Sequence, residues 1–215
     1  TNLRESPDLN AKVLAKIPNG TPLECLGDGG EGSLSFCTAQ LQQPAAEDYG
    51  FIHYSRLIFP ASDKSFVRLR EQSGRDDTLT LSGSGQKVHI VARRIHPKLS
   101  DFSGISKDKY TARLYQGKPF YGMDSMISKS VFALERITLN GQAVPAAELQ
   151  GLFSPDFAAT ARGSNVYQGW EAYYRGNDKT LYLFGRQGSD GNPFSVCFIF
   201  KDGKFQRRYL WNAAI

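Results

Sequence analysis

The sequence lacks most of the motifs on which catalytic and membrane-spanning proteins rely. It contains three cysteines and three histidines, none of them spaced as C-x-x-C or H-x-x-x-H, so it has no closely spaced ligand set for zinc. It also lacks a G-x-S-x-G nucleophile motif and a phosphate-binding G-x-x-x-x-G-K-S/T loop. The G-x-G-x-x-G letters of Gly27 to Gly32 lie in a loop between two expected strands and do not open a helix, so they make no dinucleotide fingerprint. No apolar run approaches the roughly 20 residues of a transmembrane helix. We therefore expect no metal site, no cofactor and no membrane span.

What is present is typical of a soluble globular chain, because 40% of the residues are hydrophobic and 22% are charged. The length of 215 residues suffices for one large domain or two small ones. The sequence shows neither an initiator Met nor a basic-then-apolar leader. We expect a mature periplasmic or secreted chain whose export signal has been removed; a cytosolic chain is the alternative.

Charge is distributed unevenly along the chain. Residues 1–59 contain 4 Lys/Arg and 7 Asp/Glu, a balance of −3, whereas residues 60–215 contain 22 and 14, a balance of +8. This asymmetry predicts an acidic small domain beside a basic larger one, which could steer an anionic partner to the second domain. A basic surface that is only solvated is the alternative.

Several short motifs follow one another in the first quarter of the chain. They are Asn2-Leu3-Arg4-Glu5-Ser6-Pro7, the segment Val13 to Thr21 ending in Gly20-Thr21, Ser35-Phe36-Cys37-Thr38, and Gly50-Phe51-Ile52-His53-Tyr54-Ser55-Arg56-Leu57. In this order, residues 2–57 resemble the bacterial SH3 (SH3b) family. The resemblance implies a small β barrel over residues 1–59 that binds a short peptide or a peptidoglycan stem in an aromatic-lined groove.

The sequence departs from that family where the groove would be built. Ser35-Phe36 stands where Trp-Tyr is usual, and an insertion, Gln40 to Asp48, precedes the closing strand. The remaining candidates for surface aromatic and binding residues are Tyr49, Phe51, His53 and Tyr54. The alternative is that Phe51 and Ile52 belong to the core, that His53 is a structural hydrogen-bonding residue, and that the domain is a docking scaffold.

Cys25 and Cys37 flank the glycine-rich loop Gly27 to Gly32 almost symmetrically. If the loop joins two antiparallel strands, the two cysteines lie opposite each other, close enough for a disulfide. A disulfide would imply an oxidising compartment. Two buried free thiols are the alternative. Cys197 lies in an apolar run and is expected to be an inert core thiol.

The second domain, residues 60–215, follows a linker at Ile58 to Lys64 and is predicted to be β-rich. Thr78–Leu81 and Val88–Ala92 alternate as the two strands of a hairpin. Asn140-Gly141 is a strong hairpin turn. Further strands are expected over Tyr110–Tyr121 and Ser130–Leu139, and short helices over Pro145–Gln150 and Ser154–Ala158.

The last quarter is predicted to form a four-stranded antiparallel meander. Its strands are Val166–Arg175, Lys179–Gln187, Phe194–Lys201 and Lys204–Trp211. The third is apolar on both faces and is expected to be central. In the last strand, Arg207, Tyr209 and Trp211 share one face and are candidate binding residues. The predicted fold class is mainly β, an SH3-like barrel followed by an antiparallel β domain with one or two short helices.

Catalysis is disfavoured by the order and context of the reactive residues. In the cysteine peptidases that are often fused to SH3b modules, the nucleophile opens a helix and precedes its histidine; Cys197 follows all three histidines. Asp76-Asp77, Glu135 and Glu171 could form a carboxylate pair for glycoside cleavage, but a solvated turn explains Asp76-Asp77 better. The basic and aromatic residues of the last strand are part of what a nucleic-acid-binding surface needs. Aromatic residues buried in a sheet account for the same pattern, so we expect no nucleic-acid partner.

The sequence therefore predicts a non-catalytic cell-envelope binding protein that engages a protein or peptidoglycan. One alternative is an immunity protein that neutralises a periplasmic toxin, such as a cell-wall-degrading effector, by direct binding. A peptidoglycan hydrolase is the third. Binding to insoluble peptidoglycan would favour the first, and a tight one-to-one protein complex the second.

Overall fold

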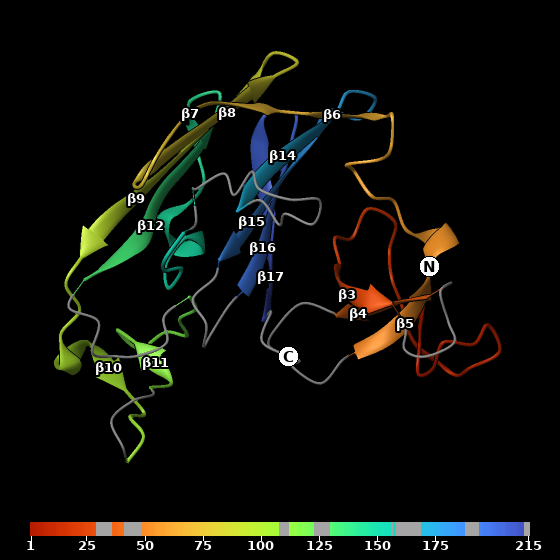
Figure 1. Cartoon of the computed structure of the whole chain (residues 1–215), viewed down its shortest axis with the longest axis horizontal. Helices are drawn as coiled ribbons and strands as arrows, with labels where there is room; N and C mark the ends of the chain where they lie inside the picture. The colour runs from red at the N-terminus through yellow and green to blue at the C-terminus, as the bar shows by residue number, and fades with distance from the viewer. Residues whose placement is uncertain are drawn as a thin grey trace. The chain divides into compact units, whose positions relative to one another are not determined.

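The computed structural model describes residues 1–28, 36–40, 49–107, 112–122, 130–155, 157, 169–187 and 194–212. The chain divides into two compact units (Figure 1). The first unit contains Thr1–Asp63 with Tyr209–Trp211, and the second contains Lys64–Arg208 with Asn212. The described residues form three five-stranded sheets and one two-stranded sheet, and the helical elements among them are short 3-10 turns. The predicted mainly-β class is confirmed.

The first unit is built on one five-stranded sheet of order β2-β1-β5-β4-β3. Its strands are β1 (Asn2–Arg4), β2 (Val13–Lys16), β3 (Glu24–Asp28), β4 (Phe36–Gln40) and β5 (Tyr49–His53), followed by the 3-10 turn η1 (Tyr54–Arg56). All the strand pairs between them are antiparallel. The buried core consists of Leu3, Ile17, Cys37, Ala39 and Ile52.

Alternation along β5 sets the two faces of this sheet. Gly50 and Ile52 are buried, whereas Tyr49, Phe51 and His53 point to the other face. A side chain at position 50 would not fit, because its Cβ would lie 2.5 Å from Leu3 Cγ. The glycine therefore lets β1 lie closely against β5.

The structure places Cys25 and Cys37 at the distance of a disulfide, as expected. Their sulfur atoms are 2.11 Å apart, and 12 positions separate the residues in sequence. Cys37 is fully buried in the first unit's core, and Cys25 packs against that core. The cross-link therefore fastens β3 to β4, where strand register is interrupted between Cys25 and Asp28.

We predict that the double variant Cys25→Ser/Cys37→Ser lowers the unfolding free energy of the first unit by about 3 kcal/mol, because a loop of this length is no longer closed in the unfolded chain. Denaturant unfolding of the full chain would measure the change. Dithiothreitol should destabilise the wild-type chain equally and leave the variant unaffected. An equal effect of the reductant on both chains would contradict the prediction.

The second unit contains two five-stranded sheets. One has the order β13-β12-β9-β8-β7 and the other β17-β16-β15-β14-β6. The strands of the first are β7 (Arg70–Arg75), β8 (Thr78–Gly83), β9 (Gln86–Ile95), β12 (Val131–Leu139) and β13 (Gln142–Ala143). Those of the second are β6 (Phe66–Arg68), β14 (Trp170–Arg175), β15 (Thr180–Gln187), β16 (Phe194–Lys201) and β17 (Lys204–Asn212). The short strands β10 (Phe102–Ser103) and β11 (Leu114–Tyr115) pair separately, and the 3-10 turns are η2 (Leu99–Asp101) and η3 (Ala146–Glu148).

Three two-residue turns with positive φ connect successive strands in the second unit. They are Ser84-Gly85 (50° and 71°), Asn140-Gly141 (50° and 85°) and Asp202-Gly203 (50° and 76°). Positive φ at both central residues matches the twist of the flanking strands, and Asn, Asp and Gly tolerate it best. The hairpins predicted around the Ser-Gly, Asn-Gly and Asp-Gly pairs are therefore confirmed.

Other expectations need correction. The helix predicted over Pro145–Gln150 is only the 3-10 turn η3, because a single turn next to a proline adds few backbone hydrogen bonds. Ser154 and Pro155 are not helical, and the rest of that predicted helix lies partly outside the described residues. Of the strand expected over Tyr110–Tyr121, the described part forms only β11.

The meander is present as predicted, with β6 added at its edge. Strands β6 and β7 were not anticipated, because Arg70–Arg75 is exposed throughout and shows no alternation. The glycine-rich Gly27–Gly32 loop, the Gln40–Asp48 insertion and the link Gly188–Asn192 lie wholly or partly outside the described residues.

Strand β16 is buried on both faces, as its sequence predicts. It lies between β15 and β17, and both Phe198 and Cys197, on opposite faces, are fully buried. The Trp170 ring stacks on Phe198 with centroids 6.4 Å apart, at an interplanar angle of 17°. Trp170 also lies over Gly185, where an added Cβ would meet its ring at 2.7 Å.

We predict that Gly185→Ala destabilises the second unit by about 1–3 kcal/mol, because the indole has no room to move away from the added methyl group. Thermal or denaturant unfolding would measure the loss. Gly176→Ala is the matched control, since the nearest atom to a Cβ there is 4.0 Å away. Equal losses of stability in the two variants would show that the destabilisation comes from the backbone preference of alanine and not from its contact with Trp170.

Candidate functional site

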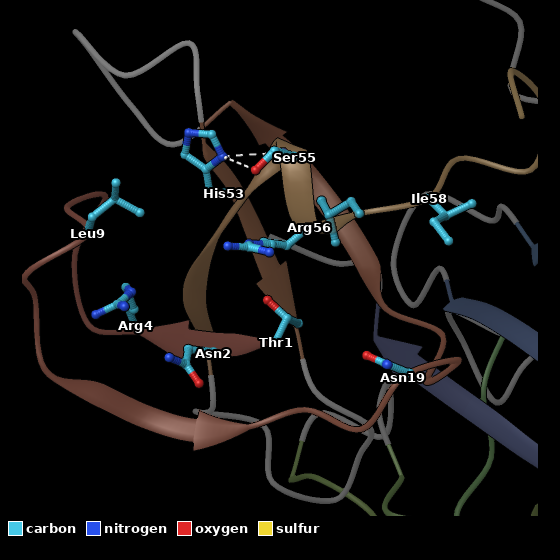
Figure 2. Close-up of a pocket in the computed structure, with 10 residues that line it drawn as sticks. Thr1, Asn2, Arg4, Leu9, Asn19, His53, Ser55, Arg56 and Ile58 are labelled. Atoms are coloured by element: carbon cyan, nitrogen blue, oxygen red, sulfur yellow. Dashed lines mark hydrogen bonds between the residues drawn. The ribbon is translucent and has the colours of Figure 1, made fainter.

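The first unit carries an open groove of about 570 Å³ (Figure 2). Segments that are far apart in sequence contribute to it: β1, the loop after β1, the turn after β2, and the end of β5 with η1. Its lining residues are Thr1, Asn2, Arg4, Leu9, Asn19, His53, Ser55, Arg56, Leu57 and Ile58.

The groove has a charge opposite to that of the sequence segment around it. Residues 1–59 contain 4 Lys/Arg and 7 Asp/Glu. Arg4 and Arg56 both line the groove, and none of the described residues that line it is acidic. An acidic domain therefore presents a locally basic hollow, which favours an anionic ligand group.

The two arginines are held differently. Arg4 lies on β1 opposite Phe51, and its NH1 donates a hydrogen bond to the carbonyl of Ala11 at 2.7 Å. That bond ties the guanidinium to the loop after β1 and leaves its other N–H groups available. Arg56 is exposed at the end of η1, and Figure 2 shows its side chain extending into the middle of the ring of lining residues.

His53 fixes the turn that carries Arg56. The backbone N–H of Ser55 donates to His53 Nδ1 at 3.2 Å, so the imidazole caps η1. Ser55 Oγ lies 2.8 Å from the same nitrogen. The other side of the ring meets Phe36 edge-on, with centroids 5.0 Å apart and an interplanar angle of 87°. Because both contacts fix the ring, His53 acts here as a positioning residue for Arg56.

Aliphatic side chains complete the groove. Leu9 and Ile58 are 61% and 60% exposed, although both are large and apolar. Asn2 and Asn19 add amide groups that can both donate and accept hydrogen bonds. The lining therefore suits a small ligand that combines a carboxylate, backbone amides and short aliphatic groups.

The sequence-predicted residues of the first unit are only partly brought together. Tyr49, Phe51 and His53 share one face of β5, but only His53 lines the groove. Tyr54 packs against the core, and its ring centroid is 6.0 Å from that of Phe59. The groove also contains Arg4, Arg56, Leu9 and Ile58, which the sequence does not identify as site residues. Arg4 and Arg56 lie inside the motifs of residues 2–57, and that position is the one signal the sequence offers for them.

Among the candidates from the last strand, the expectation that Trp211 is a binding residue needs correction. It is 1% exposed, and its Nε1 donates to the carbonyl of Gln40 at 3.1 Å within the first unit. Tyr209 stacks on it with centroids 6.1 Å apart. Because the indole is buried and its N–H already bonded, Trp211 cannot contact a partner. Arg207 is exposed and belongs to the second unit.

Of the reactive residues considered for catalysis, Asp76, Asp77 and Glu135 line one hollow of the second unit, whereas Cys197 and Glu171 are not among its described lining residues. Cys197 is fully buried, and burial raises the pKa of its thiol, which disfavours the reactive thiolate. Glu171 accepts hydrogen bonds from Arg68 and from the Tyr173 hydroxyl, each at 2.7 Å. Burial and this carboxylate raise the pKa of Tyr173. Within the described residues, no group of three or more His, Cys, Asp or Glu side chains is arranged to hold a metal ion.

Comparison of the chain with protein-family models, curated proteins and solved structures finds no match. In the described part of the chain, no helix has the length and apolar character needed to cross a membrane.

We predict that His53→Ala loosens η1 and His53→Asn does not, because asparagine can also cap a turn. The amide of Leu57, which donates to the carbonyl of Tyr54 at 2.9 Å, reports this opening. Loss of a cap costs about 0.5–2 kcal/mol, so hydrogen exchange at Leu57 should become about 2- to 30-fold faster in the alanine variant. Unchanged exchange would show that Phe36 and the core hold the turn without the imidazole.

Proposed function

We propose that the chain is a non-catalytic binding protein of the bacterial cell envelope whose first unit captures a short peptide with a free carboxylate. Peptidoglycan stem peptides are the ligand class that fits best, since they are short, rich in alanine and carry carboxylates. The observation that carries the proposal is the concentration of Arg4 and Arg56 in a groove whose described lining residues include no acidic side chain.

Arg56 supplies the anchor in this proposal. A guanidinium presents parallel N–H groups that match a carboxylate, and such charge-assisted pairs are stronger than neutral hydrogen bonds. Capping by His53 holds the backbone of η1, so less freedom is lost when the ligand binds. Asn2 and Asn19 would bond to the peptide backbone, while Leu9 and Ile58 contact its methyl groups.

Two further observations support a location outside the cytoplasm. Cys25 and Cys37 lie at disulfide distance, and disulfides persist in oxidising compartments. The motifs of residues 2–57 resemble the SH3b family, whose members bind peptides or peptidoglycan. The five-stranded antiparallel sheet of the first unit is compatible with that resemblance.

We predict that Arg56→Ala weakens binding of a free stem tetrapeptide by about 10- to 100-fold, because a hydrogen bond to a charged group contributes about 1.5–3 kcal/mol. Isothermal titration calorimetry with the full chain would measure it. Lys16→Ala is the matched control, since it removes one exposed charge from the same unit outside the groove. The C-terminally amidated tetrapeptide should bind the wild-type chain more weakly than the free acid.

Equal affinities for Arg56→Ala and Lys16→Ala would overturn the role of the groove. If the wild-type chain binds no stem peptide but forms a tight one-to-one complex with a toxin encoded beside it, the alternative of an immunity protein replaces this proposal. Degradation of cell-wall fragments by the purified chain would replace both with a hydrolase.

A further inference from the structure

The sheet β13-β12-β9-β8-β7 of the second unit has two chemically different faces. Residues paired across neighbouring strands lie on the same face, so the strand register assigns each side chain to one of them. One face is apolar and buried. Its residues are Leu79, Leu81, Val88, Ile90, Ala92, Leu134, Ile137 and Leu139.

The opposite face, which we name the basic face, consists of three rows across the strands. The rows are Arg70, Ser82 and Lys87; then Ser73, Thr80, His89 and Thr138; and then Arg75, Thr78, Val91 and Arg136. Cations therefore stand in the two outer rows, and hydroxyl groups with one imidazole occupy the middle row. At about 3.4 Å per residue, the outer rows are about 14 Å apart.

The cations of this face are exposed and available. Arg70, Arg75, Lys87 and Arg136 are all exposed, and no ion pair to another described residue involves them. The middle row is more rigid, since Thr80 is 8% exposed and its Oγ1 lies 3.1 Å from His89 Nδ1.

Acidic residues that border the face gather at one end, and Glu71, which follows Arg70, pairs with Leu81 and so belongs to the opposite face. Asp76 and Asp77 form the turn between β7 and β8, and Glu135 pairs with Arg93 at 3.6 Å. Arg70 and Lys87 lie in the row farthest from that turn. The positive charge of the face is therefore reduced in the row of Arg75 and Arg136 and retained in the row of Arg70 and Lys87.

We propose that the basic face docks an acidic polypeptide segment of a partner protein. Its guanidinium groups match carboxylates, and charge complementarity of this kind speeds and orients association. The Ser and Thr side chains between them can hydrogen-bond a polypeptide backbone and lose little conformational freedom on binding.

The chemistry of the face disfavours other anionic partners. The three rows contain no Phe, Tyr or Trp, and their one aromatic ring is the imidazole of His89, so single-stranded nucleic acid would find little base-stacking surface. Val91 is the only large apolar residue in the rows and is half-buried, so the face offers no anchor for insertion into a lipid surface. The proposal rests on the second unit alone and does not depend on the groove of the first.

A titration of the isotope-labelled full chain with a 12-residue polyglutamate peptide tests this assignment by nuclear magnetic resonance. We expect saturable shifts at the backbone amides of the three rows, weakened by salt. Arg70→Gln/Arg136→Gln should bind about 5- to 30-fold more weakly, since each exposed charge contributes up to about 1 kcal/mol. Lys201→Ala/Lys204→Ala, which removes two exposed charges from the β16–β17 turn of the same unit, is the control.

Equal weakening in both double variants, or shifts spread over all exposed lysines and arginines, would show non-specific attraction and overturn the proposal. A polyphosphate of equal charge and an oligodeoxythymidylate serve as competitors. If either displaces polyglutamate from the three rows and binds more tightly than polyglutamate, a phosphate polymer replaces the acidic polypeptide as the occupant.

Discussion

The groove of the first unit depends on how closely β1 lies against β5 at Gly50. Any side chain there would collide with Leu3 Cγ at 2.5 Å and with the Arg4 carbonyl at 2.8 Å. Because hydrogen is the only substituent, Leu3 can fill the core while Arg4, the next residue, turns to the opposite face beside Phe51. The same contact brings the end of β5, with His53 and Arg56, next to β1. The site is therefore a consequence of core packing one residue away.

In the second unit, too, the packing of the core determines which side chains are exposed. Leucine, isoleucine and valine at alternate positions of β8, β9 and β12 require one face of the sheet to be buried. Once that register is set, every residue between them must face outward, including the arginines and hydroxyl residues of the basic face. A shift by one residue would bury Arg136 and Lys87, so the hydrophobic pattern that stabilises the unit also specifies the charged surface.

Local chemistry made much of the fold predictable. Short stretches of sequence were enough to predict several elements. These are the turns at Asn140-Gly141 and Asp202-Gly203, the strand at Thr78–Leu81, which alternates polar and apolar residues, and strand β16, which is apolar on both faces. The groove could not be found in this way, since Leu9, Asn19 and Ile58 meet only after the chain has folded. Trp211 was misassigned because alternation tells which residues share a face but not what covers it. Strand β7 was missed because all its side chains are exposed and its pairing comes from β8.

The covalent link between Cys25 and Cys37 lies in the unit that holds the groove, whereas Cys197, the cysteine of the second unit, is sealed inside β16. Thiol chemistry therefore distinguishes the two halves of the chain. A reductant cleaves a disulfide and has no reaction with a free thiol, so it offers a way to impair one half selectively while the half that holds Cys197 stays intact.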